Sequence, residues 1–381
     1  MATINVGKCR SLIEIESILS KIENSVEDDK FIFSLDSLKA RHSPMHDASR
    51  LQMVVTLARQ RLEHDYLEVH PNISENAAIE EVCSYSPGIA GVRLTRGIRL
   101  GQRKIDRRDA LIAAVDKMQA TDAGNFADVV RGRSLDMICV AGSKVQYLKP
   151  LFSARGRVKE HVEMIPTIRM LIDFVTQQSR DKVPNSLVNS LGLFTTELMK
   201  NTQEHAVIDH AGKPYLAHVE GMMLGWTRFS EELFADDFKG NTNLESYWKQ
   251  ESNTTESGLT SLRAFEVSYF DSGPGLVSRF TGVPVTEMSR AQEREALLAC
   301  LQHKATSKSE HAAGEGLPSV LRELRKIGGL MRIRSGRLSM FNAFCRGDSQ
   351  RDLFQFENWT ASELAPVQGA VVSILVPLRA E

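Results

Sequence analysis

Cysteine is scarce in this sequence, and the few cysteines are scattered. The five stand at positions 9, 83, 139, 300 and 345, with no C-x-x-C pair and no histidine cluster beside any of them. Disulfide scaffolds and zinc sites need cysteines in paired or closely spaced patterns. The pattern therefore excludes a disulfide-rich protein, argues against a zinc site and predicts reduced thiols in a cytoplasmic protein.

An excess of charge of either sign is missing as well, and so are long apolar runs. Lys and Arg total 47 against 48 Asp and Glu, which gives a formal net charge of -1. General nucleic-acid binders usually carry a basic excess, so direct nucleic-acid binding is not indicated, although a local basic patch leaves it open. No apolar run reaches the roughly 20 residues of a membrane span. The first residues also lack the basic and apolar segments of a secretory signal, so we expect no membrane association.

The composition that remains is that of a globular protein with more than one domain. Hydrophobic residues make up 42% and charged residues 25% of the 381 residues. Strand patterns at 31–35 and 66–69 alternate with helical patterns that begin near Asp47 and Glu75. Such alternation predicts the α/β class. We assign residues 1–150 to a regulatory or partner-binding α/β domain.

Three further segments complete the predicted organisation. Residues 151–183 contain a long helical pattern and are expected to form a helical linker, and residues 184–381 are expected to form a second domain. Within that domain, residues 229–263 are rich in Thr, Asn and Ser and predict an insertion that is either a functional lid or disordered. A basic stretch from Arg93 to Arg108 is typical of a solvated face or linker, and the alternative is a phosphate-binding or partner surface.

A helix that begins after Pro184 carries the first candidate site residues. Glu197 and Asn201 are four residues apart and share one face, with His205 one turn further on. They flank an apolar stripe, which places them at the edge of the core, where a cleft would lie. Taken alone, Glu197 and Asn201 are better explained as an exposed helical pair.

A second candidate segment follows the strand pattern at 265–270. Asp271 comes at the end of this strand, and Gly273 and Gly275 follow it. Two glycines allow a tight turn and a close approach of the backbone to a flat ligand, and the carboxylate can accept hydrogen bonds from an exocyclic amine such as that of adenine. An ordinary turn is the alternative explanation.

A third candidate segment opens a helix near residue 317. Gly314, Gly316 and Leu317 form the pattern G-x-G-L at its start. Glycine-rich backbone at a helix N-terminus binds phosphate through free N–H groups and the helix dipole. Hydroxyl groups and lysines at 304–308 would add donors.

The three segments, in this order, resemble the GHKL superfamily, which includes gyrase, the heat-shock chaperone, histidine kinases and MutL. The pattern is E-L-x-x-N-x-x-x-H, then D-x-G-x-G at a strand end, then G-x-G-L at a helix start, then Gly369 with Pro377 eight residues on. Residues 304–317 are similar to the lid of MutL, which has its own Thr-Ser-Lys. The resemblance covers about half of the chain, residues 184–378.

The resemblance implies an ATP site on the α/β sandwich called the Bergerat fold, with a mixed sheet. Asn201 would hold Mg²⁺, and Glu197 would orient or deprotonate the attacking water in branches that hydrolyse ATP. Asp271 would bind the adenine amine, and Gly273 and Gly275 would shape the adenine pocket. The lid over the phosphates and the helix start behind it would comprise Thr306, Ser307, Lys308, Gly314, Gly316 and Leu317.

The chain departs from the family pattern at two positions. Ala312 stands where the glycine box usually opens with another Gly, which predicts a stiffer lid. Ala370 stands where Thr usually follows the last Gly, which predicts the loss of one hydrogen bond near adenine. The first 150 residues show a weaker resemblance to STAS domains, which partner GHKL proteins in some bacterial regulators.

Three functions stay open at this level. The first is slow Mg²⁺-dependent ATP hydrolysis that drives a lid or dimerisation switch and regulates a protein partner or a homodimer. The second is a protein kinase that phosphorylates Ser or His of a partner in signalling. The third is a sensor that binds nucleotide without hydrolysing it.

Overall fold

The structure is a computed structural model of the chain. It describes residues 2–39, 43–62, 64–70, 72–141, 146–176, 183–205, 207–256, 258–306, 316–345, 347 and 350–378, without the side chains of 204–205 and 303–306. Helices and strands alternate along these residues, which confirms the predicted α/β class.

The smaller of the two sheets is built from the N-terminal residues. Its strand order is β1-β2-β3-β4-β5, with parallel pairing from β1 to β4 and an antiparallel β5 at the edge. The strands are β1 (Thr3–Val6), β2 (Lys30–Ser34), β3 (Tyr66–His70), β4 (Gly97–Leu100) and β5 (Arg103–Asp106). The elements after and between them are α1 (Leu12–Glu23), α2 (Leu35–Leu38), α3 (Pro44–Arg61), α4 (Glu75–Cys83), α5 (Ser86–Leu94), α6 (Arg107–Ala110), η1 (Leu111–Ala114), α7 (Val115–Ala123) and η2 (Phe126–Asp128).

The larger sheet has eight strands in the order β12-β11-β10-β13-β9-β7-β6, with β8 paired to β9. The strands are β6 (Ser134–Ala141), β7 (His218–Ser230), β8 (Asn253–Thr254), β9 (Thr260–Asp271), β10 (Gly329–Gly336), β11 (Leu338–Phe344), β12 (Glu357–Asn358) and β13 (Val367–Pro377). Every pairing between its described strands is antiparallel. The expectation of a mixed sheet in the C-terminal half was therefore wrong, because β13 lies between β9 and β10 and pairs antiparallel with both.

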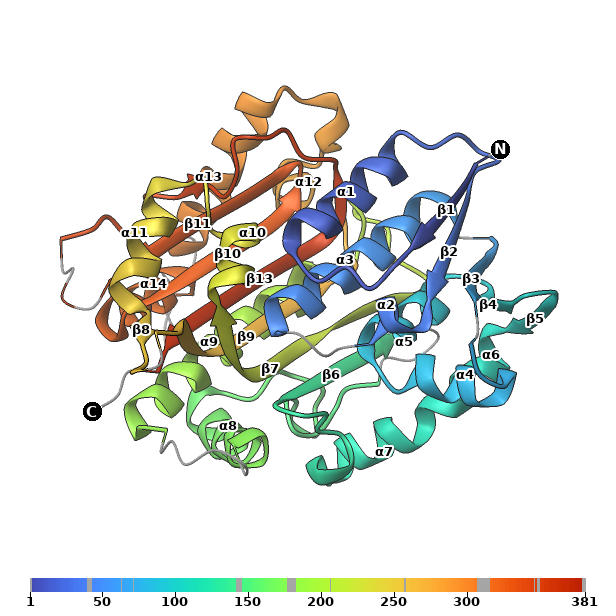
Figure 1. Ribbon diagram of the computed structural model, residues 1–381, viewed down its shortest axis with the longest axis horizontal. Coiled ribbons are helices and arrows are strands. Elements are labelled where there is room, and N and C mark those ends of the chain that lie inside the picture. The colour runs from blue at the N-terminus through green and yellow to red at the C-terminus, as the bar shows by residue number, and fades with distance from the viewer. Residues whose placement is uncertain are drawn as a thin grey trace.

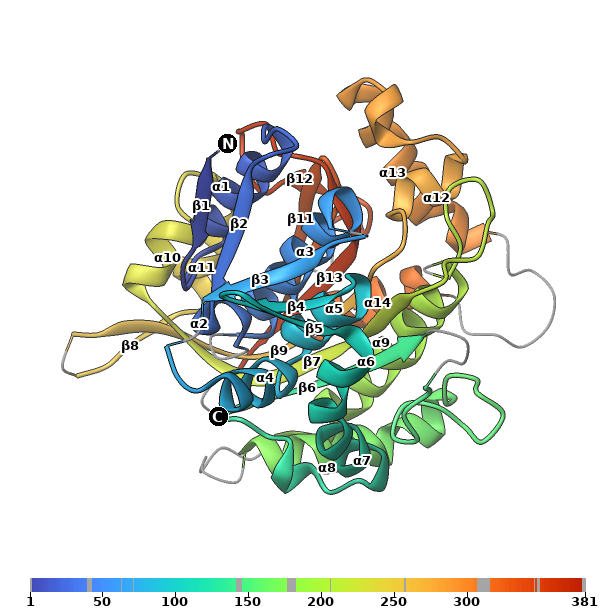
Figure 2. The same cartoon turned by 90° about the vertical axis from the view of Figure 1, so that its right-hand side faces the viewer.

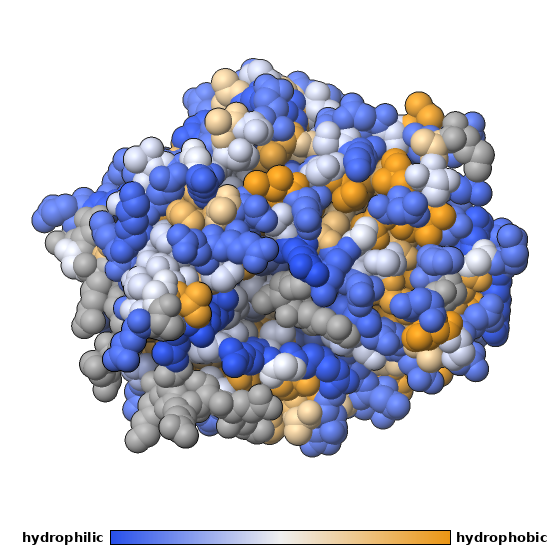
Figure 3. All heavy atoms as spheres, in the orientation of Figure 1, coloured by the Kyte–Doolittle hydropathy of each residue, from blue (hydrophilic) through white to orange (hydrophobic). Residues whose placement is uncertain are grey.

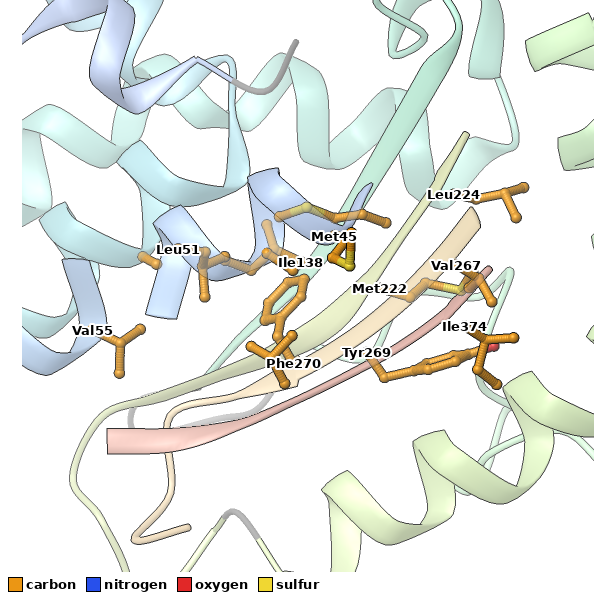
Figure 4. Packing of buried hydrophobic residues seen from close by; sticks show 14 of the residues in the cluster. Met45, Leu51, Val55, Ile138, Met222, Leu224, Val267, Tyr269, Phe270 and Ile374 are labelled. Carbon is orange, nitrogen blue, oxygen red and sulfur yellow. The ribbon is translucent and has the colours of Figure 1, made fainter. Parts of the chain in front are cut away.

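Helices cover both faces of the larger sheet, so the molecule is layered (Figures 1 and 2). Helices α1, α3 and α5 lie between the two sheets, and α8 (His161–Thr176), α9 (Asn185–His205) and α14 (Leu317–Ile327) lie on the opposite face. Figure 4 shows the same division at the level of side chains. Phe270 and Ile138 extend toward Met45 and Leu51 of α3, whereas Tyr269 points to the side of α9.

Helix α3 is the central element of this arrangement. Ser43 caps it by accepting from the His46 amide, Pro44 occupies its first turn, and every residue from Pro44 to Ala58 is buried. A helix that is buried all round must find partners for its polar side chains. On α3 these partners lie on both sides, because one sheet packs on each side of the helix.

Buried polar contacts join the N-terminal half to the larger sheet. Arg334 of β10 donates to both carboxylate oxygens of Glu16 on α1, at 2.8 and 2.9 Å. His46 bonds Asp237 at 2.5 Å through Nε2. The two halves also share one continuous hydrophobic core.

The predicted segment boundaries change in two places. Strand β6, within the range assigned to the N-terminal domain, is the edge strand of the larger sheet and pairs with β7. The described residues of the range 151–183 do not form a separate linker, because α8 packs on α9 and on β7. Their apolar stripe is buried against the sheet, where a linker helix would expose it.

The expected insertion at 229–263 forms ordinary secondary structure. It contains α10 (Glu231–Asp237), α11 (Thr242–Glu251) and β8, and β7 and β9 extend into it from both sides. Phe234 stacks on Trp248 with ring centroids 4.4 Å apart, and Phe238 packs beside them. The described residues of this segment thus form helices and strands, with an aromatic cluster between the helices, so the expectation of disorder was wrong for them.

The remaining helices follow β9 and lead to α14. They are α12 (Leu276–Thr281), η3 (Val285–Glu287) and α13 (Arg290–Thr306). The surface drawn in Figure 3 is largely hydrophilic, with apolar residues gathered mainly over the N-terminal half. Among the described helices, none combines the length and the apolar character needed to cross a membrane.

Candidate functional site

A pocket lies between the larger sheet and the helices α9, α12, α13 and α14. Its cavity volume is about 40 Å³, which is room for a few water molecules. The pocket is lined by Leu198, Asn201, Thr202, Tyr269, Asp271, Leu276, Leu301, Leu317, Ile333, Ala370 and Val372. Three of these residues, Asn201, Asp271 and Leu317, are candidate site residues named from the sequence.

Helix α9 supplies the first of them. It begins at Asn185, as expected from the break at Pro184, and its Thr195 hydroxyl bonds the Tyr269 hydroxyl of β9 at 2.9 Å. This contact holds the helix against the sheet, and Asn201 lies half-buried at the pocket wall. Glu197 is one turn earlier and only 4% exposed, and it does not line this pocket.

Asp271 lies at the end of β9 and organises the corner of the pocket. Its Oδ1 accepts from the Gly273 amide at 2.8 Å and from the Ala370 amide at 3.3 Å. The Gly369 amide in turn donates to the Gly273 carbonyl at 2.7 Å. The turn after β9 and the start of β13 are therefore locked to each other. We call residues 271–275 and 368–370 together the base corner, after the adenine base that the sequence resemblance implies at Asp271.

Glycine is required at two positions of the base corner. A Cβ atom at Gly369 would lie 2.0 Å from the Asp271 carbonyl oxygen, and its φ is +71°. Gly275 has a φ of +87°, and a Cβ atom there would lie 2.9 Å from the Ser335 hydroxyl. Side chains are strained at such φ values, so both glycines serve the close approach of β9, β10 and β13.

Ala370 departs from the family pattern at the pocket itself. Its amide already donates to Asp271, and its side chain lines the pocket as a methyl group. The hydroxyl that a Thr would supply here is missing from the sequence, so any ligand finds an apolar surface at this position.

The third segment enters through the start of α14. Gly316, with a φ of +62°, is the N-cap of the helix, and Leu317 lines the pocket. Pro318 has no N–H group, which removes one donor from a site that would bind phosphate through backbone amides. Thr306 ends α13, whereas Ser307, Lys308, Gly314 and Ala312 lie outside the described residues, as does the side chain of His205.

Two buried polar side chains next to the base corner were not predicted. Glu220 of β7 stands directly across from Asp271 of β9, is 1% exposed, and neither of its carboxylate oxygens has a hydrogen-bond partner. Burial, together with the Asp271 carboxylate, raises the pKa of Glu220 to about 8. His218 precedes it by two residues, and both of its ring nitrogens are buried without partners.

The pKa of His218 shifts in the opposite direction. Burial disfavours the imidazolium, and the cations Arg59 and Arg93 add to this, so the pKa falls to about 4. A carboxyl and an imidazole that are both neutral near pH 7 therefore lie on β7, in the strand that pairs with Asp271. A charged residue inside the apolar strand pattern at 217–224 was the sequence signal that could have revealed Glu220.

The basic stretch at 93–108 forms the β4–β5 hairpin and its flanks. Arg99 pairs with Glu68 at 3.7 Å, and Arg103 pairs with Glu75 at 2.7 Å. Arg107 donates to backbone carbonyl groups. Local partners thus take up these cations, which favours the interpretation as a solvated face.

Comparison of the chain with models of protein families, with curated proteins and with solved structures gave no match. Among the described residues, no group of three or more His, Cys, Asp or Glu side chains is placed to hold a metal ion.

Proposed function

We propose that this protein binds ATP with Mg²⁺ in the pocket between α9 and the larger sheet, as a nucleotide-binding protein of the GHKL type. One observation carries the proposal. Asn201, Asp271 and Leu317 come from three motif segments that are far apart in the sequence, and they line a single pocket. Chance matches to three short motifs would have no reason to meet at one place.

The chemistry of each residue fits a role toward this ligand. The Asp271 carboxylate accepts hydrogen bonds, as recognition of an exocyclic amine requires. The Asn201 side chain offers an amide oxygen, which is a suitable ligand for Mg²⁺. Bound Mg²⁺·ATP would supply a phosphate anhydride whose charge the metal neutralises.

The pocket must widen to admit a purine ring, because its cavity holds only about 40 Å³. Leucine side chains from three helices, Leu276, Leu301 and Leu317, narrow it. Adenine binding therefore requires these side chains to rearrange, and a shift of α12, α13 or α14 relative to the sheet is the kind of movement that a nucleotide switch uses. We propose that such a switch regulates a protein partner or a homodimer of a cytoplasmic protein.

The position of Glu197 bears on whether the protein hydrolyses ATP slowly or only binds it. As the general base, Glu197 would need to reach a water beside the γ-phosphate, yet it is buried and does not line the described pocket. This observation favours a second candidate function, a sensor that binds nucleotide without hydrolysing it. A kinase acting on Ser or His of a partner would instead transfer the phosphate.

Turnover of ATP by the purified protein and by Glu197→Gln tests these functions. If Glu197 is the base, the variant binds ATP with unchanged affinity but releases phosphate at least about 100-fold more slowly, since an amide cannot take a proton. Glu323→Gln, at a carboxylate outside the pocket that bonds Ser190, is the matched control. Equal turnover in both variants would remove Glu197 as the base, and absence of ATP binding in the wild type would contradict the proposed function.

A further inference from the structure

Helix α3 of the N-terminal half contacts the back of the base corner, on the sheet face opposite the pocket. Gln52, Thr56 and Arg59 are spaced by four and three residues, so they share one face of the helix. Gln52 and Thr56 are each 1% exposed. We call these three residues the α3 latch.

Gln52 bonds two strands of the larger sheet at once. Its Nε2 donates to the Arg334 carbonyl of β10 at 3.0 Å and to the Gly369 carbonyl of β13 at 3.4 Å. The next residue along β10, Ser335, accepts from the Leu276 amide at 2.9 Å through its hydroxyl. Gln52 thus holds the backbone of Gly369, which precedes Ala370. It also holds the backbone of Arg334, which precedes the residue that anchors Leu276. Ala370 and Leu276 both line the pocket.

Thr56 holds the residue that precedes Gly369. The Gln368 amide donates to the Thr56 hydroxyl at 3.0 Å, and this hydroxyl donates to the Gln52 carbonyl at 2.7 Å. No neighbouring strand pairs with Gln368 among the described residues. This side chain therefore adds to the contacts that hold the start of β13 against Asp271.

Arg59 holds the other half of the corner. Its Nη2 donates to the Ala217 carbonyl at 2.7 Å and to the Ser272 carbonyl at 3.3 Å. Ser272 directly follows Asp271, and its hydroxyl accepts from the Val219 amide at 2.9 Å. The guanidinium of Arg59 also lies 4.2 Å from the centre of the Tyr215 ring, which fixes its direction.

We propose that Gln52, Thr56 and Arg59 are positioning residues for the base corner, so that the N-terminal half sets the affinity of the pocket for the base of its ligand. This inference rests on the proposed nucleotide-binding function. Each latch residue bonds backbone within two residues of a pocket residue, and none of them lines the pocket. Because coupling is reciprocal, a bound base must also strengthen the attachment of α3 to the sheet.

Thr56→Val tests the proposal, because it keeps the shape of the side chain and removes the acceptor of the Gln368 amide. The matched control is Ser49→Ala on the same buried helix, since Ser49 bonds Met45 and Arg332 and makes no contact with the base corner. Thr56→Ser keeps the hydroxyl and serves as the rescue variant. Titration calorimetry with Mg²⁺·ADP and with inorganic triphosphate measures base and phosphate recognition separately.

We expect Thr56→Val to lower the affinity for ADP about fivefold, which is the effect of one hydrogen bond, and to leave the affinity for triphosphate unchanged. Ser49→Ala and Thr56→Ser should bind both ligands as the wild type does. Equal weakening of ADP by Thr56→Val and by Ser49→Ala would overturn the proposal, because general loss of stability would then explain both.

Hydrogen exchange of the ligand-free proteins provides a readout that does not depend on nucleotide. The amides of Gly273 and Ala370, which donate to Asp271, should exchange several-fold faster in Thr56→Val than in Ser49→Ala. Equal exchange in the two variants would overturn the positioning role. If the exchange differs as expected but the wild type does not bind ADP, the proposed function fails while the role of the latch in holding the corner stands.

Discussion

Replacement of Glu220 by glutamine should change how the stability of the protein depends on pH. Glu220 on β7 faces Asp271 of β9 on one side and Cys139 of β6 on the other, with His218 two residues before it. Burial first, and then the Asp271 carboxylate, raise its pKa from 4.5 to about 8. A glutamine has nearly the same shape and does not titrate in this range.

The sign of the effect follows from a folded pKa that lies above the unfolded one. Below pH 4.5 the carboxyl is protonated in both states, and the stability linked to it is fully present. As the pH rises toward about 8, the unfolded chain ionises while the folded protein keeps its proton, so this stability is lost. One pKa unit corresponds to about 1.4 kcal/mol, which gives a loss of about 3 kcal/mol at pH 7 and about 5 kcal/mol above pH 8.

Urea unfolding of both proteins between pH 5 and pH 9 measures this effect as a difference in the free energy of unfolding. The difference cancels the other groups, including His218, whose lowered pKa acts in the opposite sense and removes stability as the pH falls below 6.5. We expect Glu220→Gln to become increasingly more stable than the wild type as the pH rises, and the difference in the free energy of unfolding to become constant near pH 8. Glu266→Gln is an internal control that should level about one pH unit earlier, because burial raises the pKa of Glu266 only to about 7. A difference that stays constant from pH 5 to 9 would refute the reasoning.

Two further predictions concern the metal position and the joint between the halves. Asn201→Ala should abolish binding of Mg²⁺ with a non-hydrolysable ATP analogue in calorimetry, whereas Gln203→Ala, on the same helix, should bind normally; wild-type affinity of the Asn201 variant would remove this residue from the site. Glu16→Gln should lower the free energy of unfolding by about 3 kcal/mol, because it leaves the buried guanidinium of Arg334 without its carboxylate. Glu363→Gln, at an exposed ion pair with Arg290, should change it by less than about 1 kcal/mol, and equal effects of the two glutamines would contradict the assignment.

Local patterns in the sequence predicted the elements that carry the site. The helix after Pro184, the strand that ends at Asp271 and the helix that starts at Leu317 are all present, because capping residues, apolar periodicity and glycines act over a few residues. The expectation that these segments meet at one site rested on the order of the motifs along the chain. No single motif would have supported it.

Long-range packing accounts for what the sequence did not predict. Strand β13 pairs with β9 about 100 residues earlier, as in Val371 with Phe270, and no local pattern specifies such a register or its antiparallel sense. Gln52 and Thr56 have the character of solvent-facing polar residues on a helix, yet they are buried because the larger sheet covers the face of α3 on which they lie. In the segment 229–263, the prediction followed the many Thr, Asn and Ser residues and gave too little weight to the aromatic residues that pack α10 against α11.

The central claim is that Asp271 recognises the base of a nucleotide, and Asp271→Asn tests it most directly. The amide oxygen of asparagine can still accept from the Gly273 and Ala370 amides, so the corner keeps its backbone contacts. Its NH₂ group, however, donates where the carboxylate accepted. Competition binding with ADP, with its 6-oxo analogue IDP and with inorganic triphosphate then measures base and phosphate recognition side by side. The account predicts that the affinity for ADP falls at least tenfold, as loss of a charged hydrogen bond requires. The affinity for IDP should rise relative to that for ADP, and the affinity for triphosphate should not change. Equal weakening of all three ligands, or wild-type preference for ADP over IDP, would contradict it.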